Sequence, residues 1–91
     1  MSKAAKHIIF TGRVQGVGFR FTAFNTANRY QLTGQVRNLP DGSVEMIAQG
    51  HPDDIDNCVR DIEESLGSYI RETKIGEIPL DPQYKDFRIT F

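Results

Sequence analysis

The sequence predicts an α+β fold in which two helices pack on one face of an antiparallel β-sheet, with an extra short strand at the C-terminal end. Two segments have apolar residues three and four positions apart, which is the spacing of an amphipathic helix. The segments around them alternate apolar and polar residues, as β-strands do. The resulting order is strand, helix, strand, strand, helix, strand, and we expect a single domain over residues 1–91.

The first strand and the first helix are predicted from their apolar residues. Residues 7–13 alternate, with Ile8 and Phe10 on one face and Ile9 on the other. Apolar residues on both faces predict a central strand. An amphipathic helix is expected to follow over about residues 20–30. Its apolar stripe consists of Ala23, Phe24, Ala27 and Tyr30.

A β-hairpin is predicted next. Pro40, Asp41 and Gly42 favour a tight turn, and strand-like segments flank them at residues 34–39 and 43–49. The core-facing residues of the second segment are Val44, Met46 and Ala48.

The second helix, over residues 52–66, has the clearest signals. Pro52 suits the first helical position, and Asp53 and Asp54 complement the positive end of the helix dipole. Gly67 is a natural end for this helix. Its apolar stripe contains Ile55, Cys58, Val59, Ile62 and Leu66.

Two more strands complete the prediction. Residues 69–78 are strand-like but alternate weakly, so the ends of this strand are poorly defined. Phe87, Ile89 and Phe91 alternate and predict a short terminal strand.

This order of elements is that of the ferredoxin-like fold. Right-handed crossovers place the third strand between the first and the second. The first and second strands then run in the same direction and end at the same edge of the sheet, roughly 9–10 Å apart. Residues 15–20 follow the first strand and Asn38 ends the second, so the topology brings these two segments together.

The segment between the first strand and the first helix predicts an anion-binding turn. Gly12, Gly16 and Gly18 allow the backbone to fold tightly, with N–H groups pointing inward. Arg20 adds a fixed cation where the helix begins. The residues expected to contact a phosphoryl group are Gln15, Gly16, Val17, Gly18, Phe19 and Arg20.

The nonapeptide Gly12–Arg20 also resembles the signature of the acylphosphatase family, small enzymes that hydrolyse acyl phosphates. A second block, residues 34–45, is similar to the family's second conserved segment, whose asparagine falls at Asn38. The resemblance implies that Arg20 binds the phosphoryl group and that Asn38 orients the attacking water, with no metal, no cofactor and no phosphoenzyme. The implied reaction yields a carboxylate and inorganic phosphate, which can also bind as an inhibitor.

Composition and charge narrow the possible partners. The net charge of −1 argues against broad nucleic-acid binding, which needs a basic face. No apolar run approaches the ~20 residues of a membrane span, and the N-terminal segment has no secretory signal. Cys58 is the only cysteine, which fits a reducing cytoplasm. These features favour a cytoplasmic protein. Together with the resemblance, they lead us to expect a free-standing enzyme that acts on a small molecule, and a monomer is the simplest expectation.

Other interpretations of the same residues are open at this point. The glycines could shape a turn without binding an anion, and Asn38 could simply end a strand. The domain could also bind a phosphorylated metabolite without hydrolysing it. RNA binding is disfavoured, because the aromatic motif of RNA-recognition domains belongs on the third strand, which here has no aromatic residue. A nucleotide P-loop is excluded, because no Lys-Ser or Lys-Thr pair follows Gly18.

Overall fold

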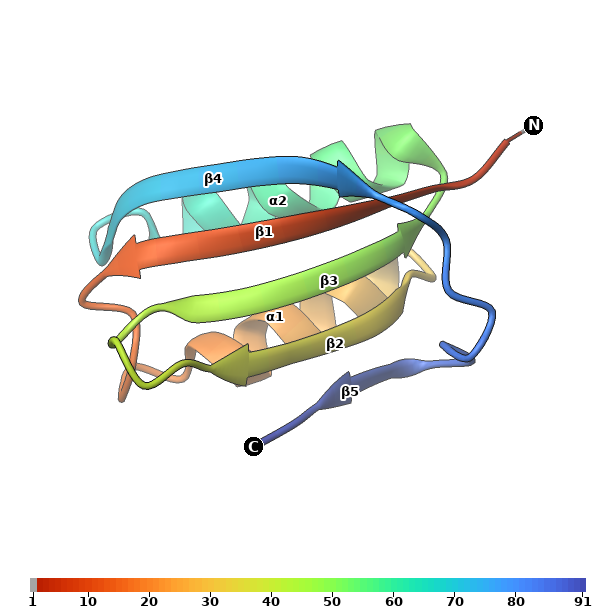
Figure 1. Ribbon diagram of the computed structural model, residues 1–91. Helices are drawn as coiled ribbons and strands as arrows, with labels where there is room; N and C mark the ends of the chain where they lie inside the picture. The colour runs from red at the N-terminus through yellow and green to blue at the C-terminus, as the bar shows by residue number, and fades with distance from the viewer. Residues whose placement is uncertain (1) are drawn as a thin grey trace.

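The protein folds into two layers, a single β-sheet and a pair of helices that both cover the same face of that sheet (Figure 1). This computed structural model describes residues 2–91. The predicted α+β, ferredoxin-like arrangement is confirmed. Among the described residues, no helix is both long enough and apolar enough to cross a membrane.

The elements follow the predicted order. The strands are β1 (Ala4–Gly12), β2 (Thr33–Asn38), β3 (Val44–Gly50), β4 (Ile70–Ile78) and β5 (Phe87–Ile89), and the helices are α1 (Phe19–Arg29) and α2 (Pro52–Leu66). The largest difference from the sequence prediction is at β1, which begins at Ala4 instead of His7. The reason is that both neighbouring strands extend far enough to pair with this segment: Ala4 pairs with Gly50, and Ala5 pairs with Ile78.

The strands lie in the order β4-β1-β3-β2-β5. β1 has a partner on each side, as predicted for a central strand, and β3 lies antiparallel between β1 and β2. β5 pairs parallel with β2, which makes the five-stranded sheet mixed. As a result, β1, β2 and β5 all run toward the same edge of the sheet, on the left of Figure 1.

The core lies between the sheet and the helices. The first residue of α1, Phe19, is already buried in it. The rings of Phe10 and Phe19 are buried and tilted, with their centroids 4.8 Å apart, so they tie β1 to the start of α1. Thr26 is also buried, which its residue type did not predict. Its hydroxyl donates to the carbonyl of Thr22 at 2.8 Å, which satisfies the buried oxygen inside the helix.

The features of α2 agree with the sequence prediction. All five residues of its apolar stripe are buried, and Asp53 and Asp54 lie in its first turn. The helix ends at Leu66, but Gly67 keeps a right-handed conformation with a φ of −58°. The chain ends the helix by turning tightly, because the N–H of Tyr69 donates to the carbonyl of Leu66 at 2.9 Å.

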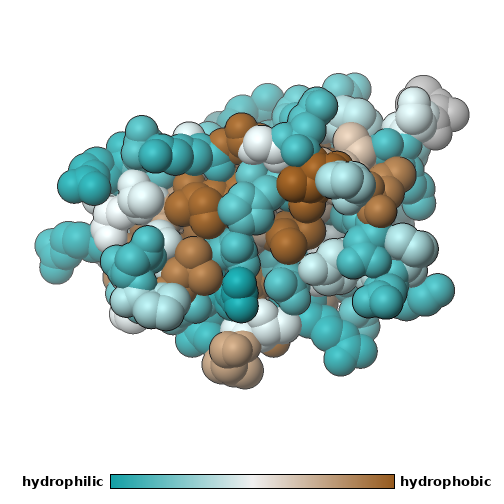
Figure 2. All heavy atoms as spheres, viewed as in Figure 1, coloured by the Kyte–Doolittle hydropathy of each residue, from teal (hydrophilic) through white to brown (hydrophobic). Residues whose placement is uncertain are grey.

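Glu45 links the three central strands on the face of the sheet that carries no helix. Figure 2 shows this face, where polar side chains surround scattered apolar ones. The Oε2 atom of Glu45 lies 2.8 Å from Nε2 of His7 on β1, and Oε1 accepts a hydrogen bond from Nε of Arg37 on β2 at 2.6 Å. Partial burial alone would raise the pKa of Glu45, but the hydrogen bonds from His7 and Arg37 outweigh it and hold the pKa below its usual value. The charged carboxylate therefore stabilises the pairing of β1 and β2 with β3.

We expect Glu45→Gln to lower the free energy of unfolding by about 1–2 kcal/mol at neutral pH, because it removes charge-assisted hydrogen bonds from a partly exposed cluster. Since the pKa of Glu45 is lowered on folding, its contribution is fully present above the unfolded pKa of about 4.3 and is lost as the pH falls through the folded value. The difference between wild type and variant in urea unfolding should therefore shrink between about pH 6 and about pH 3.

The control for this experiment is Glu64→Gln, because Glu64 is exposed on α2 and makes no side-chain hydrogen bond with residues 2–91. It should leave the free energy of unfolding unchanged at both pH values. A Glu45→Gln difference that stays constant with pH would contradict the role of the carboxylate.

Candidate functional site

The turn between β1 and α1 contains two glycines in the left-handed region. Gly16 has a φ of 80° and Gly18 a φ of 77°, conformations that L side chains rarely adopt. A Cβ atom placed on either glycine would meet no heavy atom within 4 Å, so the space over the turn is open. A ligand can therefore approach the backbone of this turn directly.

The N-terminal end of α1 has backbone N–H groups that no residue of the helix accepts, and it carries the positive end of the helix dipole. Gly18 is the N-cap, and it supplies no side-chain hydrogen bond to the helix. The first hydrogen bond within the helix runs from the N–H of Thr22 to the carbonyl of Gly18, at 3.0 Å. The N–H groups of residues 19–21 therefore have no partner inside the helix, and no acidic residue lies in its first turn to offset the dipole. Such a helix start favours an anion.

Arg20 and Asn38 line one pocket of about 270 Å³ together with Gly16 and Gly18. β1 and β2 end on the same side of the sheet, as the predicted topology requires (Figure 1), and the residues that line the pocket include Asn38 at the end of β2 and residues of the turn that follows β1. Arg20 and Asn38 are 18 positions apart in the chain, and they meet because β3 separates two strands of the same direction.

The guanidinium of Arg20 is available to bind an anion. It forms no salt bridge with any residue in the range 2–91. The guanidinium lies over the ring of Phe91, whose centroid is 4.9 Å from the Arg20 Cζ. A cation–π contact of this kind orients the side chain without neutralising its charge.

Asn38 is held in place by the hairpin that follows it. It is the last residue of β2 and pairs with Val44. Beyond it, the N–H of Leu39 donates to the carbonyl of Ser43 at 2.9 Å. Asp41 accepts from the hydroxyl of Ser43 at 2.6 Å and from its N–H at 3.0 Å, and these bonds, the hydroxyl first, hold the pKa of Asp41 below its usual value. The turn is thus closed by its own side chains.

Gln15 connects the glycine turn to this hairpin. Its side-chain Nε2 donates to the carbonyl of Leu39 at 2.8 Å and to that of Ser43 at 2.9 Å. Gln15 is one of the predicted phosphoryl contacts, but its side-chain amide donates to the hairpin, so only its backbone N–H is left for a ligand. The side chain thus acts as a brace between the two halves of the pocket.

The other predicted phosphoryl contacts divide between the pocket and the core. Gly16, Gly18, Phe19 and Arg20 all line the pocket. Val17 is half-buried and packs against the core cluster instead.

The thiol of Cys58, which could in principle act as a nucleophile, does not line the pocket. Cys58 is fully buried on α2, and burial raises the pKa of its thiol to about 12, so it is no nucleophile at neutral pH. Within the described range of residues 2–91, no group of three His, Cys, Asp or Glu side chains is arranged to hold a metal ion.

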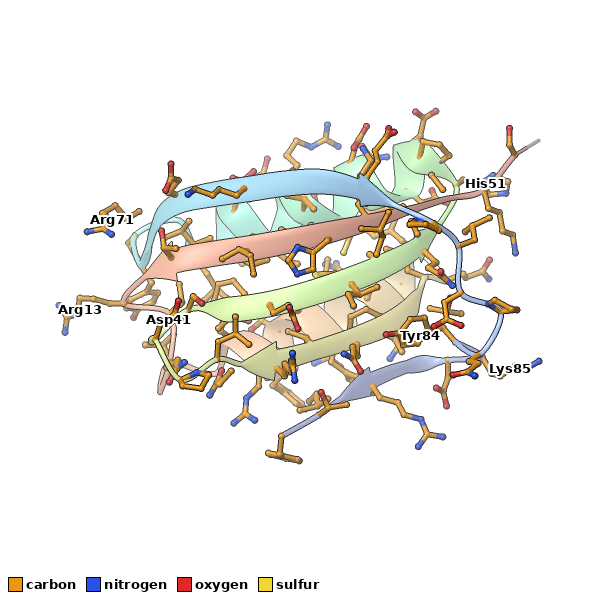
Figure 3. All side chains as sticks on the ribbon, viewed as in Figure 1. Arg13, Asp41, His51, Arg71, Tyr84 and Lys85 are labelled. Carbon is orange, nitrogen blue, oxygen red and sulfur yellow. The ribbon has the colours of Figure 1, made fainter. Side chains whose placement is uncertain are left out.

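A second, larger groove of about 710 Å³ lies at the same end of the sheet. It is lined by Arg13, Asp41, Tyr69 and Arg71, among others. Figure 3 shows Arg13 and Arg71 extending outward from this end, away from the sheet. The groove includes neither the left-handed pair Gly16 and Gly18 nor a carboxamide side chain. The pocket of Arg20 and Asn38 is therefore the better candidate for chemistry.

Sequence reasoning missed the apolar rim of this pocket. Phe21, Ile89 and Phe91 all line the pocket, whereas the sequence assigned Ile89 and Phe91 only to a terminal strand. The alternation of Phe87, Ile89 and Phe91 predicted a strand, but it gave no information on the strand's partner.

A two-layer α+β fold in which an open glycine turn, Arg20 and Asn38 line one pocket is the arrangement expected of a small domain that binds a phosphorylated molecule. Comparison with known proteins agrees. The family model Acylphosphatase matches residues 6–89. An acylphosphatase from Chlorobaculum tepidum is 41% identical over 90 residues that cover 98% of each chain, and one from Geobacillus thermodenitrificans is 41% identical over 86 residues.

Solved structures give the same result. The crystal structure of acylphosphatase from Bacillus subtilis superposes with a TM-score of 0.89 at 31% identity, covering 99% of this chain and 100% of that one. Full-length HypF, in a phosphate- and nucleotide-bound form, contains a similar region that is 12% of its length, with a TM-score of 0.87 at 34% identity. The chain belongs to the acylphosphatase family, and it is an enzyme that hydrolyses acyl phosphates. The alternative of a domain that only binds a phosphorylated metabolite is therefore set aside.

We expect Gln15→Met to lower kcat by about tenfold, because a displacement of catalytic groups by a fraction of an ångström is costly. The free energy of unfolding should fall by only about 1 kcal/mol, the usual value of a neutral hydrogen bond. Steady-state hydrolysis of benzoyl phosphate and urea unfolding measure the two effects.

Gln35→Met is the matched control, because the side chain of Gln35 makes no hydrogen bond with residues 2–91. It should leave kcat within about twofold of wild type. If Gln15→Met keeps the full kcat while the protein remains folded, the brace is not needed for the reaction.

Proposed function

We propose that this acylphosphatase hydrolyses its substrate by direct, in-line attack of water on phosphorus, without a metal ion and without a phosphoenzyme. The observation that supports this proposal best is that Arg20 and Asn38 line one pocket beside an open amide turn. Phosphoryl transfer depends mainly on positioning and on charge stabilisation, and this pocket offers groups for both.

The phosphoryl group binds to the turn and to Arg20. Its three oxygens accept hydrogen bonds from backbone N–H groups at residues 15–20, and the planar guanidinium of Arg20 contributes a permanent positive charge and paired donors. The uncapped start of α1 adds its dipole to the same position. These donors also stabilise the charge that spreads over the equatorial oxygens in the transition state.

Asn38 orients the water. Its Oδ1 accepts a hydrogen bond from the water and its Nδ2 donates to a phosphoryl oxygen. The water oxygen forms a bond to phosphorus as the bond from phosphorus to the acyl oxygen breaks. The electron pair of that bond leaves with the carboxylate, and both water protons end on the released phosphate.

The chemistry of an acyl phosphate explains why so few groups suffice. A carboxylate is a good leaving group, so it needs no general acid to depart. The buried thiol of Cys58 takes no part, since burial keeps it protonated. Inorganic phosphate, as the product, should compete for the same amides and for Arg20.

The expectations that depend on composition alone stay predictions. We infer a monomer that acts in the cytoplasm on a small molecule and binds no nucleic acid. Support comes from the net charge of −1 and from the single cysteine.

We expect Arg20→Ala to lower kcat/KM for benzoyl phosphate by about 10³-fold or more, because it removes charge stabilisation in both the bound and transition states. Inhibition by inorganic phosphate should weaken with it. Asn38→Ala should lower kcat by about 10²-fold to 10³-fold and leave phosphate inhibition nearly unchanged. All assays contain a chelator.

Arg13→Ala and Asn25→Ala are the matched controls, because both residues are exposed and neither lines the pocket. They should keep wild-type kinetics. Full activity of Asn38→Ala would exclude Asn38 as the water-orienting group, and loss of wild-type activity in chelator would exclude the metal-free reaction.

A further inference from the structure

A second pocket, of about 410 Å³, lies at the other end of the sheet from Arg20 and Asn38, and we call it the far pocket. Its lining comes from the junction of α1 with β2, the junction of β3 with α2, and the loop between β4 and β5. Figure 3 shows two of its residues, His51 and Tyr84, at the end of the molecule away from Arg13. The far pocket shares no residue with the pocket of Arg20 and Asn38, so phosphoryl chemistry does not account for it.

Two features of the far pocket are unfavourable for the protein by itself. Gln31 is the only residue other than glycine within the range 2–91 that has a positive φ, of 57°. It follows the C-cap of α1 in a Schellman motif, closed by the N–H of Leu32 and the carbonyl of Ala27 at 3.0 Å, where glycine is the usual residue. The Nδ1 atom of His51 is buried and has no hydrogen-bond partner among residues 2–91. Strain and unpaired buried atoms concentrate at functional sites, and both residues line this one pocket.

The loop that forms the outer wall of the far pocket is held in place by Gln49. The side chain of Gln49 is buried, its Nε2 donates to the carbonyl of Asp81 at 3.0 Å, and its Oε1 accepts from the N–H of Asp81. The carboxylate of Asp81 in turn accepts from the N–H of Gln83 at 2.9 Å. Because the wall is already ordered, a ligand loses little affinity to the cost of ordering it.

Rings and alkyl groups make up the apolar part of the lining. They belong to Tyr30, Leu80, Pro82 and Tyr84. The hydroxyl of Tyr30 donates to the carboxylate of Asp61, which holds the ring in position. Leu80 is half-exposed, so part of this apolar surface is open to a ligand.

The charged groups of the lining favour a cation. Asp54 and Asp81 supply two carboxylates, whereas Lys3 is the one lining residue with a permanent positive charge. Neither carboxylate forms a salt bridge with residues 2–91. The start of α2 also borders this pocket, but Asp53 and Asp54 in its first turn offset the helix dipole. An anionic acyl phosphate is therefore repelled here, and an ammonium group is attracted.

We propose that the far pocket binds a small organic amine in its cationic form. The ammonium pairs with the carboxylates of Asp54 and Asp81, and an aromatic or alkyl body packs against Tyr30 and Tyr84, whose ring faces also attract a cation. The carboxamide of Gln31 supplies a further hydrogen bond to the same ligand. This site is separate from the hydrolytic pocket, so the two proposals stand or fall independently.

The test titrates 2-phenylethylamine into ¹⁵N-labelled protein and follows its NMR spectrum. Primary alkyl amines are cationic at neutral pH. Saturable shifts should centre on the amides of residues 31–33, 49–54 and 80–84, with a Kd of about 1 mM. The matched ligand is 3-phenylpropionate, which has the same ring and linker but carries a carboxylate. It should bind at least about tenfold more weakly.

Variants of the carboxylates test the pairing. Asp54→Asn and Asp81→Asn should each raise the Kd of 2-phenylethylamine about threefold to tenfold. Asp53→Asn is the control, because Asp53 lies in the same first turn of α2 but does not line the far pocket. It should leave the Kd within about twofold of wild type.

Gln31→Gly separates binding from folding. Glycine adopts the left-handed conformation without a steric cost, so the midpoint of urea unfolding should not fall. The Kd of the amine should nevertheless rise about threefold, because the carboxamide is lost. An unchanged Kd in this variant would contradict the role given to Gln31.

The absence of saturable shifts at the far pocket, or shifts that centre on another surface, would overturn the proposal. Equal binding of 3-phenylpropionate would show that the lining does not select a cation and would also overturn it. So would a rise in Kd with Asp53→Asn as large as that with Asp54→Asn.

Discussion

The pairing of β3 between β1 and β2 is the constraint on which the site depends. Because β3 is antiparallel to both, β1 and β2 run in the same direction and end at one edge of the sheet. The glycine turn leaves one of these ends and Asn38 lies at the other. The contacts of Glu45 with His7 and Arg37 reinforce this pairing from the face without helices, and the brace from Gln15 fixes the ends relative to each other.

The positive charge at the pocket comes from a few groups close to it and not from the charge of the whole protein. The protein as a whole carries a net charge of −1, yet Arg20 forms no salt bridge with residues 2–91 and the first turn of α1 has no acidic residue. The carboxylates of Asp41 and Glu45 accept hydrogen bonds from other residues. Asp41 accepts from Ser43 in the hairpin turn, and Glu45 accepts from Arg37 on the face of the sheet without helices. The pocket can therefore attract a small anion although the protein as a whole is slightly acidic.

Local signals account for what the sequence predicted well. The apolar stripe of α2, the turn at Pro40 to Gly42 and the glycines before α1 are short-range patterns, and each has the structure that its residues favour. The right-handed crossover rule then placed Arg20 and Asn38 together. The family follows from the same two segments.

Features that depend on long-range contacts could not be predicted. The partner of β5 is set by the free edge of β2, and the segment before it is held by Gln49, whose Nε2 donates to the carbonyl of Asp81 at 3.0 Å. Without that partner, the position of Phe91 at the pocket is not visible in the sequence. The side chain of Gln15 is a similar case, because its acceptors lie 24 and 28 positions away.

Titration of inorganic phosphate into ¹⁵N-labelled protein, followed by NMR, shows whether the glycine turn and Arg20 form the phosphoryl site. If they do, saturable shifts will centre on the amides of residues 15–21 and on the side-chain groups of Arg20 and Asn38. Shifts centred on Arg13 and Arg71, with the amides of the glycine turn unchanged, would contradict this assignment of the site.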